Sequence, residues 1–410
     1  MNRMQWPLAG LLCCLPLAGT GNADDPPAVE ELIQALQSKD LPARRNAAYD
    51  LDQLGKQAAP AVAALTAALD DADQQVWSRS ASALAGIGPA AEPAIPKLVA
   101  GLPGGGQRAY RYGYALSQIG SAALPALLET LQHEKPVARG AAARSLGWMG
   151  PAADPAVTAL LELFEDADMS VQQLASAALG RIGSIAPLVE TLAHDVPARR
   201  RGAAAALGQL ATPPAVAVPA LVTLFADSDH TVRAQALTTV GIFGTGVVPH
   251  LPQLVAAMTD AQENVRTAAV SGLTRARPHS LPAVPLLVPH LKHDRPEVVL
   301  TASRALGRFG AAAKMAIPAL IAALPNIDPE QDNTTLPRTF QRIGPDAIPP
   351  LIAALKSDNP RVLVLVAISL GRFGSRAEAA RAALEPHRAH SDPAVSAAAQ
   401  AAFAKLGSSP

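Results

Sequence analysis

The sequence has few residues whose types and spacing could bind a metal ion or catalyse a reaction. Nine histidines are scattered along the chain, and those that come nearest to a ligand pair, His290 and His293, have only Asp294 beside them as a further ligand. A zinc site needs more protein ligands than this pair supplies, so a solvated turn explains it better. The chain has no G-x-S-x-G motif, P-loop or candidate cysteine nucleophile. We therefore expect no catalytic residue, no metal and no cofactor.

One acidic segment is comparable with a calcium-binding loop. Asp328, Glu330 and Asp332 alternate as the ligands of a calcium loop do. The segment has neither the glycine at the sixth position nor the late bidentate glutamate of such a loop. We interpret it as an acidic turn.

Arginine recurs at one position of a repeated pattern, just before its last apolar residue. The members are Arg181, Arg275, Arg308, Arg342 and Arg372. Such a row could hold a polyanion, for example an acidic glycan or a lipid head group. A cation near a helix C-terminus is also favoured by the helix dipole and by free carbonyls. We favour this second explanation because other copies place Gln53, Gln118 and Gln209 at the same position.

The tyrosines and tryptophans are confined to one part of the chain. Apart from Trp6, they are Tyr49, Trp77, Tyr110, Tyr112, Tyr114 and Trp148. Tyr112 occupies a position that other copies fill with a buried alanine, whereas Tyr110 and Tyr114 lie one helical turn apart on the open side. Tyrosine, tryptophan and arginine are the residues that anchor protein interfaces. The predicted partner-binding residues are Trp77, Arg79, Tyr110, Arg111, Tyr114, Arg144 and Trp148. For Trp77, filling a wide gap between units is an equally good explanation.

These residues are carried by a pattern of about 33 residues that occurs twelve times. Its landmark is L-G-x-I/F-G, as in Leu306-Gly307-Arg308-Phe309-Gly310. The copies end at Gly55, Gly88, Gly120, Gly150, Gly183, Ala211, Gly244, Arg277, Gly310, Gly344, Gly374 and Gly407. Repetition at this period predicts a stack of small units rather than a globule with one centre.

Each copy is typical of two helices. The second has apolar residues at steps of three and four and ends at a glycine that accepts a left-handed backbone. The first is shorter and opens with proline, which suits a first helical turn. No stretch alternates with a period of two, so we predict an all-α fold. In the tenth copy, Pro337 predicts a second helix shortened to about Thr335–Ile343 and a local change in curvature.

The unit Pro-x-Leu-x-x-x-Leu, Asp-x-Asp, Val-Arg-x-x-Ala-x-x-Ala-Leu-Gly-x-Ile-Gly resembles the HEAT repeat, in particular the short variety found in phycobilisome lyases. The resemblance implies a right-handed α-solenoid of about twelve helix pairs, with the second helices on the concave face. It also implies a ladder of Asp–Arg contacts between units, onto which Arg44, Arg139, Arg200, Arg233 and Arg266 map. The copies with Trp77, Ala109, Gln172 or Leu363 at this position depart from it.

The N-terminus has the layout of a secretory signal peptide. Residues 1–23 contain Arg3, an apolar run and a small-residue end, so we expect cleavage before Asp24. A lipoprotein signal at Cys13 or Cys14 is the alternative, although Leu12 is poorly suited to it. Cleavage before Asp24 would leave no thiol, as suits a bacterial periplasmic or secreted protein. Residues 24–410 would form a single elongated solenoid domain.

Charge and hydropathy narrow the range of partners. The chain has 34 basic and 34 acidic residues, which gives no bulk attraction to nucleic acid. We expect no segment beyond the N-terminus to reach the length of a membrane span. We also expect a monomer. The leading hypothesis is an exported, non-enzymatic scaffold that binds a protein or extended ligand on its concave face. The alternatives are a lyase or chaperone-like enzyme of the bilin-attaching type, suggested by resemblance alone, and a structural envelope component.

Overall fold

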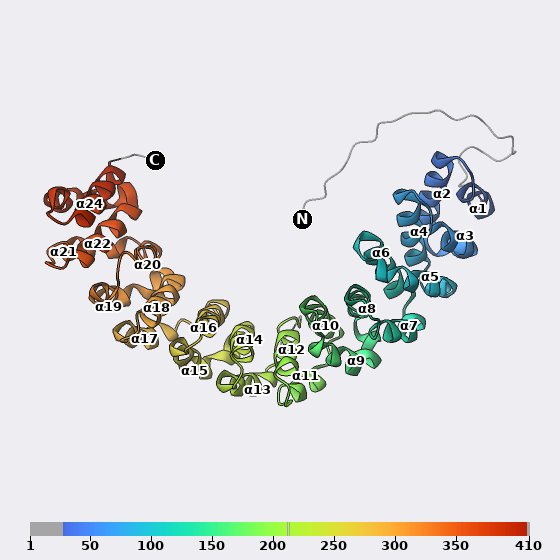
Figure 1. Ribbon diagram of the computed structural model, residues 1–410, viewed down its shortest axis with the longest axis horizontal. Helices are drawn as coiled ribbons and strands as arrows, with labels where there is room; N and C mark the ends of the chain where they lie inside the picture. Colours follow the sequence, from blue (N-terminus) through green and yellow to red (C-terminus); the bar gives the residue numbers. More distant parts are fainter. Residues whose placement is uncertain (1–27, 211, 213, 408–410) are drawn as a thin grey trace. The chain divides into compact units, whose positions relative to one another are not determined.

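The computed structural model describes residues 28–210, 212 and 214–407, and these residues form helices and turns without a strand. They contain 24 α-helices, which follow one another as pairs (Figure 1). The all-α solenoid predicted from the repeat is therefore confirmed. The predicted signal peptide, residues 1–23, lies outside the described residues, as does Ala211, the expected end of the sixth copy.

The first helix of each pair is short. These helices are α1 (Val29–Leu36), α3 (Val62–Ala68), α5 (Ile95–Ala100), α7 (Leu124–Thr130), α9 (Val157–Glu162), α11 (Ile185–Thr191), α13 (Ala217–Thr223), α15 (Leu251–Ala256), α17 (Ala283–Leu287), α19 (Ile317–Ala323), α21 (Ile348–Ala354) and α23 (Arg381–Leu384). Many are preceded or followed by a turn of 3-10 helix.

The second helix of each pair is longer and carries the surface residues discussed below. These helices are α2 (Leu41–Leu54), α4 (Gln74–Ile87), α6 (Gly106–Ile119), α8 (Pro136–Met149), α10 (Met169–Ile182), α12 (Pro197–Leu207), α14 (His230–Val240), α16 (Glu263–Arg275), α18 (Pro296–Phe309), α20 (Thr335–Ile343), α22 (Pro360–Phe373) and α24 (Pro393–Leu406).

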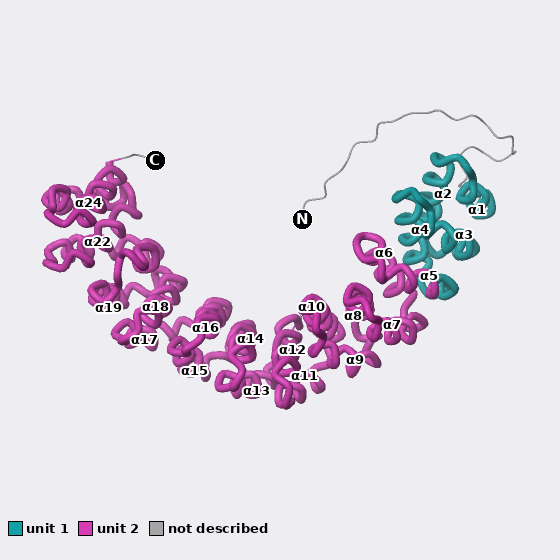
Figure 2. Tube along the Cα trace, viewed as in Figure 1, with its two compact units in different colours: residues 1–94 teal, residues 95–410 magenta. Residues whose placement is uncertain are grey.

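The pairs belong to two compact units (Figure 2). The first unit ends at Ala94 and contains α1 to α4, and the second begins at Ile95 and contains α5 to α24. Within each unit, every second helix packs against the second helix of the next pair, for example α2 against α4 and α8 against α10. No helix could bury its apolar stripe alone, so each unit's core is built from contacts between neighbouring pairs.

Small residues allow the second helices to approach closely. On α8, Ala141, Ala142 and Ala143 are buried, as is Leu146. A Cβ atom at Gly147 would lie 2.8 Å from the Cα atom of Ala178 on α10. A larger residue at Gly147 would therefore force the two helices apart.

Most glycines that close the copies have positive φ, as predicted, but Gly407 has φ −100°, and the predicted left-handed helical conformation is the exception. It occurs at Gly183, with φ 84° and ψ 15°. Gly150 has φ 61° and ψ −140°, and Gly310 has φ 59° and ψ −136°. Residues with a side chain are also excluded from this second conformation. Glycine is therefore required as predicted, but for this conformation and not for the left-handed helical one.

The tenth pair has the predicted short second helix. Helix α20 spans Thr335–Ile343, with nine residues, whereas α18 and α22 have 14 each. Pro337 does not interrupt a hydrogen bond inside this helix. It is the third residue of α20, in the first turn, where no intrahelical N–H bond is needed.

Two helical segments, residues 230–259 and 296–326, are long and apolar enough to cross a membrane by length and composition. The expectation that no segment would reach this length is therefore wrong. Neither segment is one straight helix: each joins a second helix to the next first helix through a glycine with positive φ. Gly244 has φ 54° and Gly310 has φ 59°. Buried residues of both segments belong to the hydrophobic core of unit 2.

Candidate functional site

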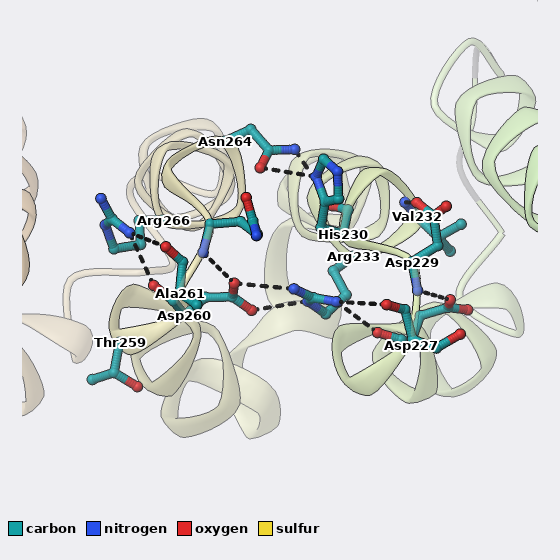
Figure 3. Close-up of polar contacts among 12 residues, drawn as sticks. Asp227, Asp229, His230, Val232, Arg233, Thr259, Asp260, Ala261, Asn264 and Arg266 are labelled. Atoms are coloured by element: carbon teal, nitrogen blue, oxygen red, sulfur yellow. Dashed lines mark hydrogen bonds and ion pairs between the residues drawn. The ribbon is translucent and has the colours of Figure 1, made fainter.

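Paired arginine and aspartate side chains hold successive helix pairs in register. Arg233 on α14 donates from Nε and Nη2 to the two carboxylate oxygens of Asp260, at 2.8 and 3.0 Å. Its Nη1 donates to the carbonyl oxygens of Asp227 and Ser228, at 2.8 and 3.2 Å (Figure 3). One guanidinium thus links the turn before its own helix to the turn of the next pair. Bidentate contacts of this kind fix geometry as well as adding energy.

The same contacts recur at the predicted ladder positions. Arg44 pairs with Asp71 at 2.7 Å, Arg139 with Asp166 at 2.6 Å, and Arg200 with Asp227 at 2.7 Å. In every case the aspartate lies 27 residues after the arginine. The hydrogen bond from Arg139 lowers the pKa of Asp166, so the carboxylate stays ionised well into acid. The ladder implied by the family resemblance is present at these four arginines.

Arg266 is the ladder arginine that the structure leaves without an aspartate. It still donates from Nη1 to the carbonyls of Asp260 and Ala261, at 3.0 and 2.8 Å. Its side chain is buried, and its Nε atom has no hydrogen-bond partner among the described residues. The residue 27 positions later is His293, not an aspartate. This substitution explains the missing contact.

In four of the turns, a histidine stands where the ladder turns have an aspartate. At His133, His194, His293 and His390, the Nδ1 atom accepts the backbone N–H two residues later, at 3.0 Å. The ladder aspartates use a carboxylate oxygen for the same bond, as Asp166 does with Asp168 at 2.8 Å. Three of these histidine turns follow copies without a ladder arginine, at Ala109, Gln172 and Leu363. These four histidines therefore have a structural role.

Above this framework, four of the predicted partner-binding residues form one cluster in unit 2, which we call the aromatic–arginine face. Its members are Tyr110 and Tyr114 on α6, and Arg144 and Trp148 on α8. The ring centroids of Tyr110 and Trp148 are 5.0 Å apart at 80°, and those of Tyr114 and Trp148 are 5.9 Å apart at 79°. Both are edge-to-face contacts, which favour aromatic pairs beyond the area they bury.

A close approach between α6 and α8 brings these rings together. A Cβ atom at Gly113 would lie 2.4 Å from the Oγ atom of Ser145, so glycine is needed where the two helices meet. Tyr110 and Tyr114 remain 49% and 44% exposed. The register had placed both on the open side of α6, and the structure agrees.

Arg144 completes the aromatic–arginine face from the side. Its guanidinium carbon lies 5.4 Å from the ring centre of Tyr110 and 5.5 Å from that of Trp148, within cation–π range. Burial lowers the pKa of the Arg144 guanidinium. Its Nε atom is buried and has no hydrogen-bond partner among the described residues. A buried donor without an acceptor is costly, so this atom can gain from a ligand that brings one.

Arg111 and Tyr112 flank the face differently. Arg111 is exposed on α6. Tyr112 is buried, as predicted, with 3% of its surface exposed. A Cβ atom at Gly101 would lie 2.4 Å from the Tyr112 ring. Gly101 therefore leaves space for this ring, which the buried alanine of other copies does not need.

Trp77 and Arg79, the other two predicted binding residues, belong to unit 1. Trp77 is 7% exposed and forms part of that unit's core, so its ring offers almost no surface to a partner. The gap-filling explanation is the better one for this residue. Arg79 is exposed, pairs with Asp52 at 2.8 Å and lies 5.0 Å from the ring centre of Tyr49. Tyr49, which the sequence had not assigned to the site, is 48% exposed.

The residues considered for metal binding are dispersed. Among the described residues, no group of three or more histidine, cysteine, aspartate or glutamate side chains could hold a metal ion. His290 is partly buried, and burial lowers the pKa of its imidazole. Asp332 accepts hydrogen bonds from the backbone N–H groups of Thr334 and Thr335, both at 2.8 Å, at the start of α20. The acidic segment thus contributes a helix-capping carboxylate.

Comparisons with known proteins agree with this architecture. A family profile described as HEAT repeats matches residues 109–180, 157–241, 185–274, 251–332 and 335–404. No curated protein matches the chain in sequence. Among solved structures, Kap121p bound to Pho4p is similar over 94% of this chain and 46% of Kap121p, with 14% identity and a TM-score of 0.52. An engineered protein aligns over 93% of this chain and 99% of its own, with 22% identity and a TM-score of 0.33.

Proposed function

Because the chain belongs to the family of HEAT-repeat proteins, we propose that it is an exported, non-enzymatic scaffold that binds another protein. The aromatic–arginine face of α6 and α8 is its docking site. The observation that carries this proposal is the cluster of half-exposed tyrosines against Trp148 and Arg144. Solenoids of this kind present long rows of side chains that suit extended partners.

The chemistry of the face indicates what the partner presents. Arg144 holds a buried Nε–H without an acceptor, and its charge lies in partly desolvated surroundings. A carboxylate placed beside it would satisfy this donor and neutralise the charge. Tyr110 and Tyr114 supply ring surface for apolar side chains and a hydroxyl each. We infer that the partner is an extended protein segment with an acidic residue next to apolar ones.

Export is part of the proposal because of residues 1–23. Their single arginine, short apolar run and small-residue end support a cleaved leader, with the mature chain beginning at Asp24. Mass spectrometry of the native protein tests this directly. A mature start near Asp24 is expected, whereas a diacylglyceryl group on Cys13 or Cys14, or retention of residues 1–23, would contradict it.

The docking site is tested first by placing a photo-crosslinking amino acid at Tyr114 in cells of the native organism. The same amino acid at Tyr49, which is equally exposed but lies in unit 1, is the matched control. One partner captured from position 114 and not from position 49 is the expected result. Equal capture from both positions, or capture of many proteins, would count against a discrete docking site.

The captured partner then allows a measurement of affinity. Tyr110→Ala combined with Tyr114→Ala should weaken binding at least tenfold, because interface anchors carry most of the binding energy. The melting temperature should change little, since both side chains are half exposed. Arg308→Ala with Arg372→Ala should weaken binding less. Unchanged affinity in the tyrosine variant would place the site elsewhere, and a large fall in stability would assign the tyrosines to packing.

A further inference from the structure

A groove of about 430 Å³ lies in unit 2, over the second helices of the eighth, ninth and tenth pairs. Five arginines line it: Arg275 on α16, Arg304 and Arg308 on α18, and Arg338 and Arg342 on α20. Apart from one valine, the remaining lining residues are serine and threonine. Its volume falls within the range of small-molecule binding sites.

The groove has a strong excess of positive charge. No aspartate or glutamate lines it. The nearest acid along α20 is Asp332, whose carboxylate is already bonded to the backbone and hydroxyl groups of Thr334 and Thr335. Asp332 therefore serves the start of the helix and does not pair with the five arginines.

These arginines differ from the ladder arginines in having no partner. All five are exposed, and none forms an ion pair or a side-chain hydrogen bond among the residues that the structure describes. Arg304 and Arg308 lie four residues apart on one helix, as do Arg338 and Arg342. Like charges at this spacing repel each other and destabilise a helix. The arrangement is unfavourable unless an anion is bound.

The explanation from helix ends accounts for Arg308 only in part. Arg308 lies in the last turn of α18, where the helix dipole favours a cation. Its side chain makes no bond to the carbonyls at the end of α18 in the described structure. The carbonyl of Arg308 instead accepts from Nη1 of Arg277, at 2.6 Å.

We propose that this groove binds a small molecule carrying two or more phosphate or sulfate groups. Guanidinium groups match these anions because each can donate two parallel hydrogen bonds. The arginines come from three helices, so an anion with several charged groups can contact more of them than a single phosphate can. The serine and threonine hydroxyls around them can donate to the remaining oxygens.

The test is isothermal titration calorimetry of the purified full chain with tripolyphosphate at low salt. We expect saturable binding that weakens as salt is raised. Inorganic phosphate should bind at least tenfold more weakly than tripolyphosphate. A sulfated disaccharide, titrated in parallel, distinguishes a sulfate ligand from a phosphate ligand, and tighter binding of either supports the groove.

Substitutions connect the binding to these residues. Arg304→Gln with Arg338→Gln should weaken tripolyphosphate binding at least tenfold and leave the melting temperature unchanged. Arg181→Gln is the control, because Arg181 is exposed on α10, at the repeat position that Arg308 and Arg342 occupy on α18 and α20, and lies outside the groove. No saturable binding, equal binding by the double variant, or an equal loss in the control would overturn the proposal. So would tighter binding of an acidic peptide than of tripolyphosphate. The tyrosine variant should bind tripolyphosphate normally, which separates this site from the docking site.

Discussion

Two sets of arginines in this chain differ in whether an aspartate lies within reach and in how far they are buried. Arg139, Arg200 and Arg233 each reach a carboxylate in the next pair and are largely buried. Arg304, Arg308 and Arg338 lie on the open surface of the second helices with no acidic partner lining their groove. Arginine therefore holds neighbouring helix pairs together in the ladder and leaves positive charge uncompensated in the groove. The repeat fixes the first use, and the second is free to vary between copies.

This comparison predicts, first, that acid should weaken the ladder where the pKa of the aspartate is lowered, at Asp71, Asp166 and Asp260. The hydrogen bond from Arg139 lowers the pKa of Asp166. Outside the ladder, the hydrogen bond from Arg45 lowers the pKa of Asp73, the N-cap residue of α4, to about 2. Carboxylates with lowered folded-state pKa values contribute stability above the unfolded value of about 4. That contribution is lost as pH falls through the folded-state pKa values. The melting temperature, followed by circular dichroism, should fall steeply between about pH 4 and pH 2. A flat profile there would show that the ladder adds little stability.

Removal of one carboxylate should have the next largest effect. Asp227→Ala leaves Arg200 largely buried without its partner, which should cost roughly 3 kcal/mol. The loss should appear as faster hydrogen exchange in α12 and α14, because neighbouring pairs share the contact. Asp195→Asn is the control, since Asp195 lies in an adjacent turn and contributes its carbonyl, not its carboxylate, to Arg200. Similar exchange in both variants would contradict the role of the pair.

The missing contact at Arg266 should be repairable. His293→Asp places a carboxylate 27 residues after Arg266, the separation found at every ladder pair. We expect a gain of about 1 kcal/mol, the net contribution of a typical hydrogen bond that satisfies a buried donor. Urea denaturation measures it. The gain should disappear in a background of Arg266→Gln, and a gain that persists there would have another cause.

The smallest effect is expected for the open arginines. Arg304→Gln with Arg338→Gln should change the free energy of unfolding by less than about 0.5 kcal/mol, as is usual for surface positions. Relief of repulsion should make the change neutral or slightly stabilising. A clear loss of stability in thermal denaturation would show that these residues belong to the framework, and the contrast with the ladder would then fail.

The repeat pattern predicted the framework well because its rules are local. Spacing placed the helix pairs, Pro337 predicted the shortened α20, and the resemblance to the HEAT repeat implied the arginines that form the ladder. Arg266 departed from the prediction because its partner position holds His293, which the sequence shows once the separation of 27 residues is known. Trp77 is harder, since register does not reveal how wide a gap its ring must fill.

The open surface was only partly predictable. Tyr110 and Tyr114 follow from their position on α6, but the contact of both rings with Trp148 depends on the close helix approach at Gly113. The arginine groove was missed in part because its row was defined by one position of the repeat. Arg304 and Arg338 lie one turn earlier on α18 and α20, and only the packing of these helices brings them to the same groove.

The constant separation of the ladder residues has a consequence for how such a chain can change in length. Arg200 with Asp227 and Arg233 with Asp260 form junctions with the same geometry and the same spacing. Consider the segment between equivalent points of two such junctions. It contains the aspartate that pairs with the preceding repeat and the arginine that pairs with the following repeat. Duplicating or excising that segment would leave every remaining junction complete. The chain can thus gain or lose whole repeats at these junctions without a compensating substitution in the Arg–Asp ladder.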